Sequence, residues 1–293
     1  MFPFGSRQAP PPQLPRPIPP LHGETTKSYL YRLTVANQLH PDDLRAHLIG
    51  ARSHTPVTVE SLAAATGRSA HALRYALPEL RTSAPGADPS IPGHIRRTVC
   101  RHCAARRDIF PFAIVWQPVE MTVCTAHLIW LGPPGDRRHH GPQYYIGDLP
   151  EIRHAQQEHR KLARRHGREA TAEAVAEAAH ITALWARRGY YLDRRAPLIQ
   201  TLLGSAPLTG KLPSGHPVTS IVTYPETVGL ARVLVTPRWR YPANRLTKRE
   251  ISQFRREISH HLGIRYDPGD NGYDPLFRWF QKHHHVTCHR SGS

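Results

Sequence analysis

The sequence has few acidic residues, few cysteines and no long apolar run, and each shortage excludes a class of protein. The 22 Asp and Glu are outnumbered by 39 Lys and Arg, which leaves few carboxylates to hold the Mg²⁺ of nucleases or transposases. Four cysteines in 293 residues provide no disulfide framework. No stretch approaches the roughly 18 consecutive apolar residues that span a bilayer, so the sequence predicts no transmembrane helix.

Positive charge and proline are abundant instead. A formal net charge of +17 favours a polyanionic partner, most simply double-stranded DNA or RNA, bound through its phosphates. A membrane surface is the alternative with the same charge preference. Residues 1–20 contain eight prolines and no apolar core of a signal peptide, so we expect a cytoplasmic, nucleoid-associated protein. The 39% hydrophobic content and the length allow two or three domains.

Three of the four cysteines lie in one short stretch, in the spacing of a metal site. Cys100 and Cys103 form a C-x₂-C pair, and Cys124 and His127 form a C-x₂-H pair twenty residues later. Two such turns supply the four ligands that tetrahedral Zn²⁺ prefers, and the β-branched residues 114–124 resemble the strands of a zinc ribbon. The sequence therefore predicts one structural Zn²⁺ in a closed site. The alternative is a chance pairing of cysteines in a reduced protein.

The fold class predicted is mainly α, with helix-turn-helix-type regions and a small β zinc ribbon inserted between two helical halves. A first helix follows Thr25, and its helical spacing places Arg32 outward. The predicted parts are a Pro-rich arm (1–21), an N-terminal helical domain with the helix-turn-helix (22–92), the ribbon (93–147) and a basic C-terminal helical domain (148–293).

Residues 57–80 have the proportions of a helix-turn-helix. Thr58 and Ser69 are placed to cap two short helices that Gly67 separates. Their inner face would consist of Leu62, Ala65, Leu73 and Leu77. Arg68, His71 and Arg74 would then lie near the start of the second helix, the part that reads bases in a major groove. A helical hairpin that only packs is the alternative.

Two further groups of cations are candidate DNA contacts. The first surrounds the Cys100–Cys103 turn, and the second lies on a helix expected over residues 248–262 with a buried stripe of Ile251, Phe254 and Ile258. Solvated surface charge is the alternative for both. The candidates are Arg96, Arg97, Arg101, Arg106 and Arg107 in the first group and Lys248, Arg249, Arg255 and Arg256 in the second.

Enzymatic chemistry has little support in the sequence. The acidic residues most suited to a metal, Asp267, Asp270 and Asp274, occupy a Gly- and Pro-rich loop, and no phosphate-binding loop or nucleophile elbow occurs. Residues 283–289 are rich in His and include Cys288, but a polar tail explains them without a metal. We therefore expect no catalytic residues.

Residues 17–33, PIPPLHGETTKSYLYRL, resemble the opening of TniQ/TnsD-type transposition proteins, which characteristically read P-x-P-x-x-G-E-[ST]-x-x-S-[WYL]-L-x-R-L. The CxxC, a Trp116-Gln117 pair and the C-x-x-H follow in the family's order, so the resemblance covers residues 14–131. Members often carry a second Cys pair after the C-x-x-H. Its absence here supports a single zinc.

The resemblance implies a zinc-containing, non-catalytic, DNA-binding protein that selects target sites or acts as an adaptor in a transposition system. Its expected partners are duplex DNA and a transposition ATPase or transposase, or a CRISPR effector complex. A DNA-binding transcriptional regulator, or an assembly adaptor without direct DNA readout, is the alternative. The sequence leaves the target site and the oligomeric state open, a homodimer included.

Overall fold

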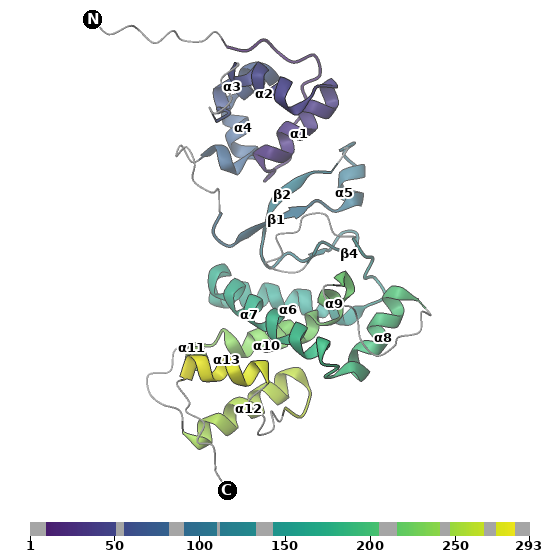
Figure 1. The fold of residues 1–293 in the computed structure, drawn as a ribbon, viewed down its shortest axis with the longest axis vertical. Coiled ribbons are helices and arrows are strands. Elements are labelled where there is room, and N and C mark those ends of the chain that lie inside the picture. Colours follow the sequence, from purple (N-terminus) through teal and green to yellow (C-terminus); the bar gives the residue numbers. More distant parts are fainter. Residues whose placement is uncertain are drawn as a thin grey trace, which may run out of the picture. The chain divides into compact units, whose positions relative to one another are not determined.

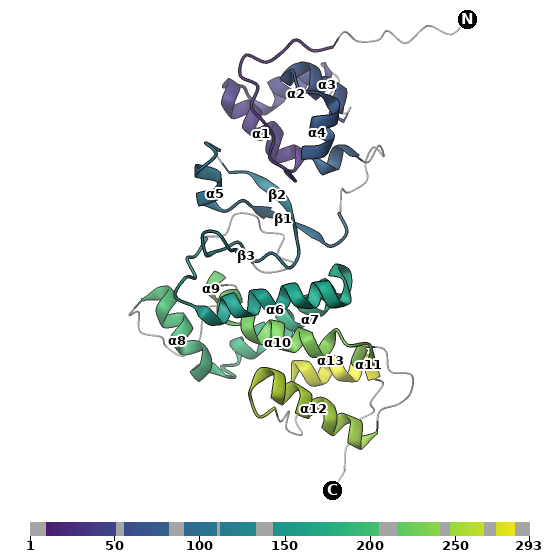
Figure 2. The ribbon, with the colours of Figure 1, turned by 180° about the vertical axis from the view of Figure 1, so that it is seen from behind.

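The structure, a computed structural model, describes residues 10–50, 56–81, 91–109, 112–132, 143–204, 216–240, 247–266 and 274–284. The chain is mainly helical with a small β-ribbon between two helical parts of the sequence, which confirms the predicted fold class (Figures 1 and 2). It divides into two compact units, residues 1–117 and residues 118–293. The finer division into four parts stays a prediction.

The first unit begins with a small helical bundle, the purple and blue elements of Figure 1. Apolar side chains from each helix share one core, which also takes in Leu14 of the Pro-rich arm. The arm is fixed there by a hydrogen bond from Leu14 N to the Ala65 carbonyl, 2.7 Å long. The helices are α1 (Thr26–Asn37), α2 (Pro41–Ile49), α3 (Val59–Thr66), α4 (Ala70–Ala76) and a 3₁₀ helix (Pro78–Arg81).

The predicted pair of short helices is present as α3 and α4. Thr58 Oγ1 accepts from Ser61 N at 3.1 Å, and Ser69 Oγ accepts from Ala72 N at 3.2 Å. Gly67 ends α3 with φ of +66°, the left-handed conformation that glycine adopts without strain. The four residues predicted for the inner face, Leu62, Ala65, Leu73 and Leu77, are all fully buried.

The outward position predicted for Arg32 is wrong. Its side chain is buried, and Nη1 lies 2.7 Å from Oε2 of the fully buried Glu24. Glu24 also accepts from Ser28 Oγ and from Leu21 N, both at 2.9 Å. A buried carboxylate is tolerated only when it is paired and hydrogen-bonded, so these contacts account for both burials.

The same segment is attached to the ribbon strand β2 (Ile114–Pro118), which pairs with β1 (His94–Thr98). Thr25 N donates to the Ile114 carbonyl at 2.9 Å, and Trp116 N donates to the Gly23 carbonyl at 2.7 Å. Gly23 has φ of +78°, and a Cβ there would lie 3.1 Å from the Trp116 oxygen. Both the backbone conformation and the close approach therefore call for glycine.

The second unit is built around α10, which contacts α6, α7 and α12 (Figures 1 and 2). One face of α7, which includes Ala174, Ile181 and Trp185, belongs to the shared core. The helices are α6 (Pro150–His166), α7 (Arg168–Arg187), α8 (Leu192–Leu203), α9 (Pro217–Val222), α10 (Tyr224–Leu234), α11 (Pro237–Arg240), α12 (Lys248–Leu262) and α13 (Pro275–His284).

The helix α12 has the predicted bounds because its start is encoded locally. Thr247 and Glu250 form a capping box in which each side chain bonds the other's backbone N–H. Phe254 and Ile258 are buried, and α12 approaches α10 closely at Gly229, where a Cβ would lie 3.0 Å from the His261 carbonyl oxygen. Among the residues that the structure describes, no helix combines the length and hydropathy needed to cross a membrane.

We expect Glu24→Gln to lower the free energy of unfolding of the first unit by about 3 kcal/mol, since it leaves the Arg32 guanidinium buried without its counter-ion. Hydrogen exchange of the α1 amides in the full chain measures this change. The matched control is Glu60→Gln, which breaks the solvent-exposed pair with Arg74 and should lower stability by less than about 1 kcal/mol. Equal losses in the two variants would contradict the role assigned to Glu24.

Candidate metal centre

The two predicted ligand pairs are carried by different local structures. Cys100 immediately precedes the short helix α5 (Arg101–Ala105), which contains Cys103. Cys124 ends strand β3 (Val123–Cys124), which pairs antiparallel with β4 (Ile129–Trp130). His127 lies in the intervening turn, which Leu128 closes with φ of +51°. Each pair thus occupies one tight turn of the backbone.

The ligand atoms of these four residues converge. The three Sγ atoms and one ring nitrogen of His127 lie within 4.8 Å of one another, and Cys124 Sγ is 3.6 Å from His127 Nδ1. Tetrahedral Zn²⁺ with Zn–S of about 2.3 Å and Zn–N of about 2.0–2.1 Å has sulfur–nitrogen edges of about 3.6 Å. None of the three cysteines is in a disulfide. The cluster can therefore hold a metal ion.

The composition of the cluster indicates a structural centre. Its ligands are three cysteines and one histidine, with no Asp or Glu among the described residues that converge there. Cys100 is buried and the other three ligands are half-buried. Four protein ligands fill the coordination sphere of Zn²⁺, whereas catalytic zinc keeps a position for water.

Gln156 of α6 positions the β3 turn, a role that the sequence did not reveal. Its Oε1 accepts from Thr122 N at 3.0 Å and from Thr122 Oγ1 at 2.6 Å. Its Nε2 donates to the Glu120 carbonyl, and the amide is almost fully buried. These bonds fix the backbone two residues before Cys124. Because the partners are 34 residues apart in sequence, no local pattern could have indicated them.

The candidate DNA-contact residues of the first unit have different surroundings. Arg74 is exposed and pairs with Glu60 at 2.9 Å, and His71 is exposed, whereas Arg68 is half-buried. Arg96 lies over the Trp116 ring, 5.6 Å from its centroid, and Arg97 is only 3% exposed. The remaining candidates near the first cysteine pair, Arg101, Arg106 and Arg107, are all exposed.

The candidate cations of α12 lie on one helix, away from its buried stripe. Lys248, Arg249 and Arg256 are exposed and Arg255 is half-buried. The structure thus brings these four onto one helix, while the candidates near the cysteines belong to a different part of the fold. Tyr241 and the basic residues 137–140 lie outside the described residues.

Asp274 has a structural role. Its Oδ1 accepts from Tyr266 Oη at 2.8 Å and from two backbone amides at the start of α13, and its Oδ2 accepts from Trp185 Nε1 at 2.9 Å. Burial, with a contribution from Asp274, raises the pKa of Tyr266 well above its usual range. The other two acidic candidates, Asp267 and Asp270, and residues 285–289 of the His-rich tail lie outside the described residues.

The fold and the cluster define a helical protein with a Cys₃His ribbon. The TniQ family model matches residues 15–131, which confirms the predicted resemblance, and this part of the chain is similar to TniQ proteins. The match covers 117 of the 293 residues. No curated protein matches the chain. No solved structure matches it either.

We expect the purified protein to contain one tightly bound metal ion per chain, and Cys103→Ser to lose it. Elemental analysis measures the content, and a thermal melt measures the accompanying loss of stability. Cys288→Ser is the matched control, because it removes the one cysteine that is not among the four predicted ligands. Full metal content in Cys103→Ser, or an unchanged melt after verified metal removal, would contradict the assignment.

Gln156→Ala should weaken metal retention about 10-fold or more, since residues that orient ligands affect metal affinity on that scale. The variant also leaves the buried Thr122 N–H without a partner. A competition titration with a chelator measures the change. Gln157→Ala, an exposed neighbour on the same helix, should retain the metal as the unaltered chain does. Equal affinities in the two variants would refute the positioning role.

Proposed function

We propose that this protein is a zinc-containing, non-catalytic DNA-binding component that selects target sites, or acts as an adaptor, in a transposition system. The observation that carries the proposal is the TniQ match over residues 15–131, whose last part contains the converging Cys₃His cluster. Zn²⁺ is the metal that three thiolates and one imidazole favour. Bound there, it stabilises the ribbon, on the order of 10 kcal/mol in small zinc modules.

Exposed cations supply the DNA-binding part of the proposal. Three groups of side chains would meet phosphates: Arg74 on α4 with the exposed His71 one turn before it, the arginines around α5, and the basic face of α12. A formal charge of +17 adds a long-range attraction to any polyanion. Arg97 is buried, so its guanidinium supports the ribbon in this proposal and makes no phosphate contact.

We also propose that the protein has no catalytic activity. The metal cluster is closed by its four protein ligands, and Asp274 uses both oxygens to fix Trp185, Tyr266 and the start of α13. Neither group is then available to activate water or to hold a catalytic Mg²⁺. Labelled duplex DNA incubated with the protein and Mg²⁺ should stay intact.

The partners that we propose are duplex DNA and a transposition ATPase or transposase, or a CRISPR effector complex in place of direct target recognition. The protein would act in the cytoplasm on the nucleoid, as a monomer or a homodimer. The second candidate function is an assembly adaptor that does not read DNA, which the half-buried or paired state of Arg68, Arg74 and Arg96 favours. Survival of a partner complex after nuclease treatment would support the adaptor.

A salt titration of duplex DNA binding tests the proposal, because each phosphate contact contributes about one unit to the slope of log K against log[salt]. Lys248→Gln/Arg249→Gln should lower the slope by about two. Arg106→Gln/Arg107→Gln makes the same test near the metal centre. The matched control is Arg164→Gln/Arg165→Gln, which removes two exposed charges from α6. A slope near zero for the unaltered chain would exclude phosphate contact.

A further inference from the structure

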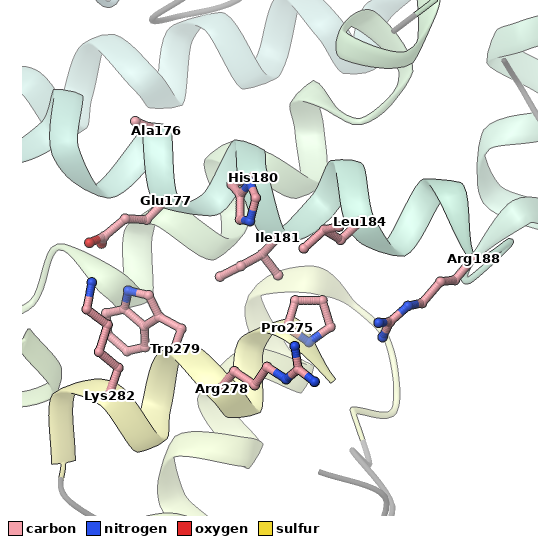
Figure 3. Close-up of a pocket in the computed structure, with 10 residues that line it drawn as sticks. All are labelled: Ala176, Glu177, His180, Ile181, Leu184, Arg188, Pro275, Arg278, Trp279 and Lys282. Atoms are coloured by element: carbon pink, nitrogen blue, oxygen red, sulfur yellow. The ribbon is translucent and has the colours of Figure 1, made fainter. Parts of the chain in front are cut away.

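A groove lies between α7 and α13 in the second unit, outside the TniQ match (Figure 3). Its volume is about 600 Å³. The floor is apolar: Ile181 and Leu184 extend from α7 toward α13, which contributes Pro275 and Trp279. This volume lies in the range of ligand pockets, about 300–1,000 Å³, and accommodates a few side chains of a bound segment.

The rim of the groove is cationic. Arg188 at the end of α7 and Arg278 and Lys282 on α13 line it, all of them exposed. Glu177 is the one carboxylate in the lining against these three cations, and it also pairs with Arg240, which it shares with Glu173, at 3.0 Å. The groove therefore complements an anionic ligand.

The apolar floor argues against nucleic acid as that ligand. A phosphodiester backbone has no apolar group to cover Ile181 and Leu184. Base stacking requires an open aromatic face. Trp279 is 7% exposed, and its ring stacks on His283 with centroids 4.2 Å apart, so this aromatic ring is already covered.

We propose that the groove binds an acidic amphipathic helix of a partner protein. Apolar side chains at helical spacing would fill the floor over Ile181 and Leu184, and carboxylates on the flanks would meet Arg188, Arg278 and Lys282. The adjoining residues 285–293 contain no Asp or Glu, so they do not complement this rim. The site adds to the proposed function and does not depend on it, because DNA contact involves none of these residues.

A panel of synthetic peptides tests the charge and the apolar stripe separately. Three fluorescent peptides of about 16 residues share Leu at i, i+3, i+4 and i+7 and carry Glu, Gln or Lys elsewhere. A fourth carries Glu with the Leu positions replaced by Ser. Fluorescence anisotropy with the full chain should rank the Glu peptide tightest, at least 10-fold above the Lys peptide and above the Ser-substituted one.

A charge-reversal pair assigns the binding to the groove. Arg278→Glu/Lys282→Glu should weaken the Glu peptide at least 10-fold. Arg153→Glu/Arg164→Glu makes the same change in net charge on exposed positions of α6 and should leave the affinity within about twofold, as surface charges away from a site do. Leu184→Ser, a half-buried floor position, should also weaken binding, and its circular dichroism spectrum checks the fold.

Several results would overturn the proposal. Failure of the Glu peptide to bind would contradict the proposed site, as would a Ser-substituted peptide that binds as tightly as the Glu peptide. Equal losses of affinity for the Glu peptide in the two charge-reversal variants would also contradict it. Displacement of the Glu peptide by single-stranded oligothymidine would assign the groove to nucleic acid. Concentration-dependent self-association that Arg278→Glu/Lys282→Glu abolishes would assign it to a second copy of the chain. A failed DNA titration would leave all these outcomes unaffected.

Discussion

The buried carboxylate of Glu24 is the constraint on which the first unit depends. It takes hydrogen bonds from Arg32 and Ser28 of α1 and from the backbone of the Pro-rich arm at Leu21. Ser28 in turn accepts from Ile114 N, so the network extends into β2. The arm, the first helix and a ribbon strand are thus fixed relative to one charged group. The polar groups of the Gly-Glu-Thr-x-x-Ser segment, residues 23–28, make hydrogen bonds within the protein. We infer that this segment serves the fold.

Features that depend on residues close together in the sequence, such as helix ends and paired ligands, could be predicted from the sequence. The bounds of α12 follow from the Thr247–Glu250 capping box and from helical spacing, and the C-x₂-C and C-x₂-H pairs indicated the metal cluster. The burial of Arg32 could not be predicted, because spacing on a helix does not report a counter-ion in the extended segment before it. The role of Gln156 could not be predicted for a similar reason: its partner, Thr122, lies just before β3, 34 residues away in the sequence.

The positive charge is distributed over groups with different roles, which a count of residues does not separate. Arg32 and Arg195 are buried in ion pairs with Glu24 and Glu226, and Arg97 is buried too. Burial raises the pKa of Glu226, and the Arg195 guanidinium opposes that rise. Such arginines hold the fold together. Other cations, on α5, on α12 and at the rim of the α7–α13 groove, are exposed, and their surroundings differ from one group to the next.

The close packing at Gly229 fixes the position of α12 against α10. A single added methyl on α10 would press against the backbone of α12, the helix that carries the candidate DNA-contact cations, at 3.0 Å from the His261 oxygen. A larger side chain at position 229 would therefore push α12 away from α10. Substituting Gly229 by successively larger small residues would change the orientation of α12 relative to α10, while the number of its charged side chains stays the same. Substitution at position 229 would thus vary the direction of the basic surface of α12 without changing its charge, two properties that usually change together.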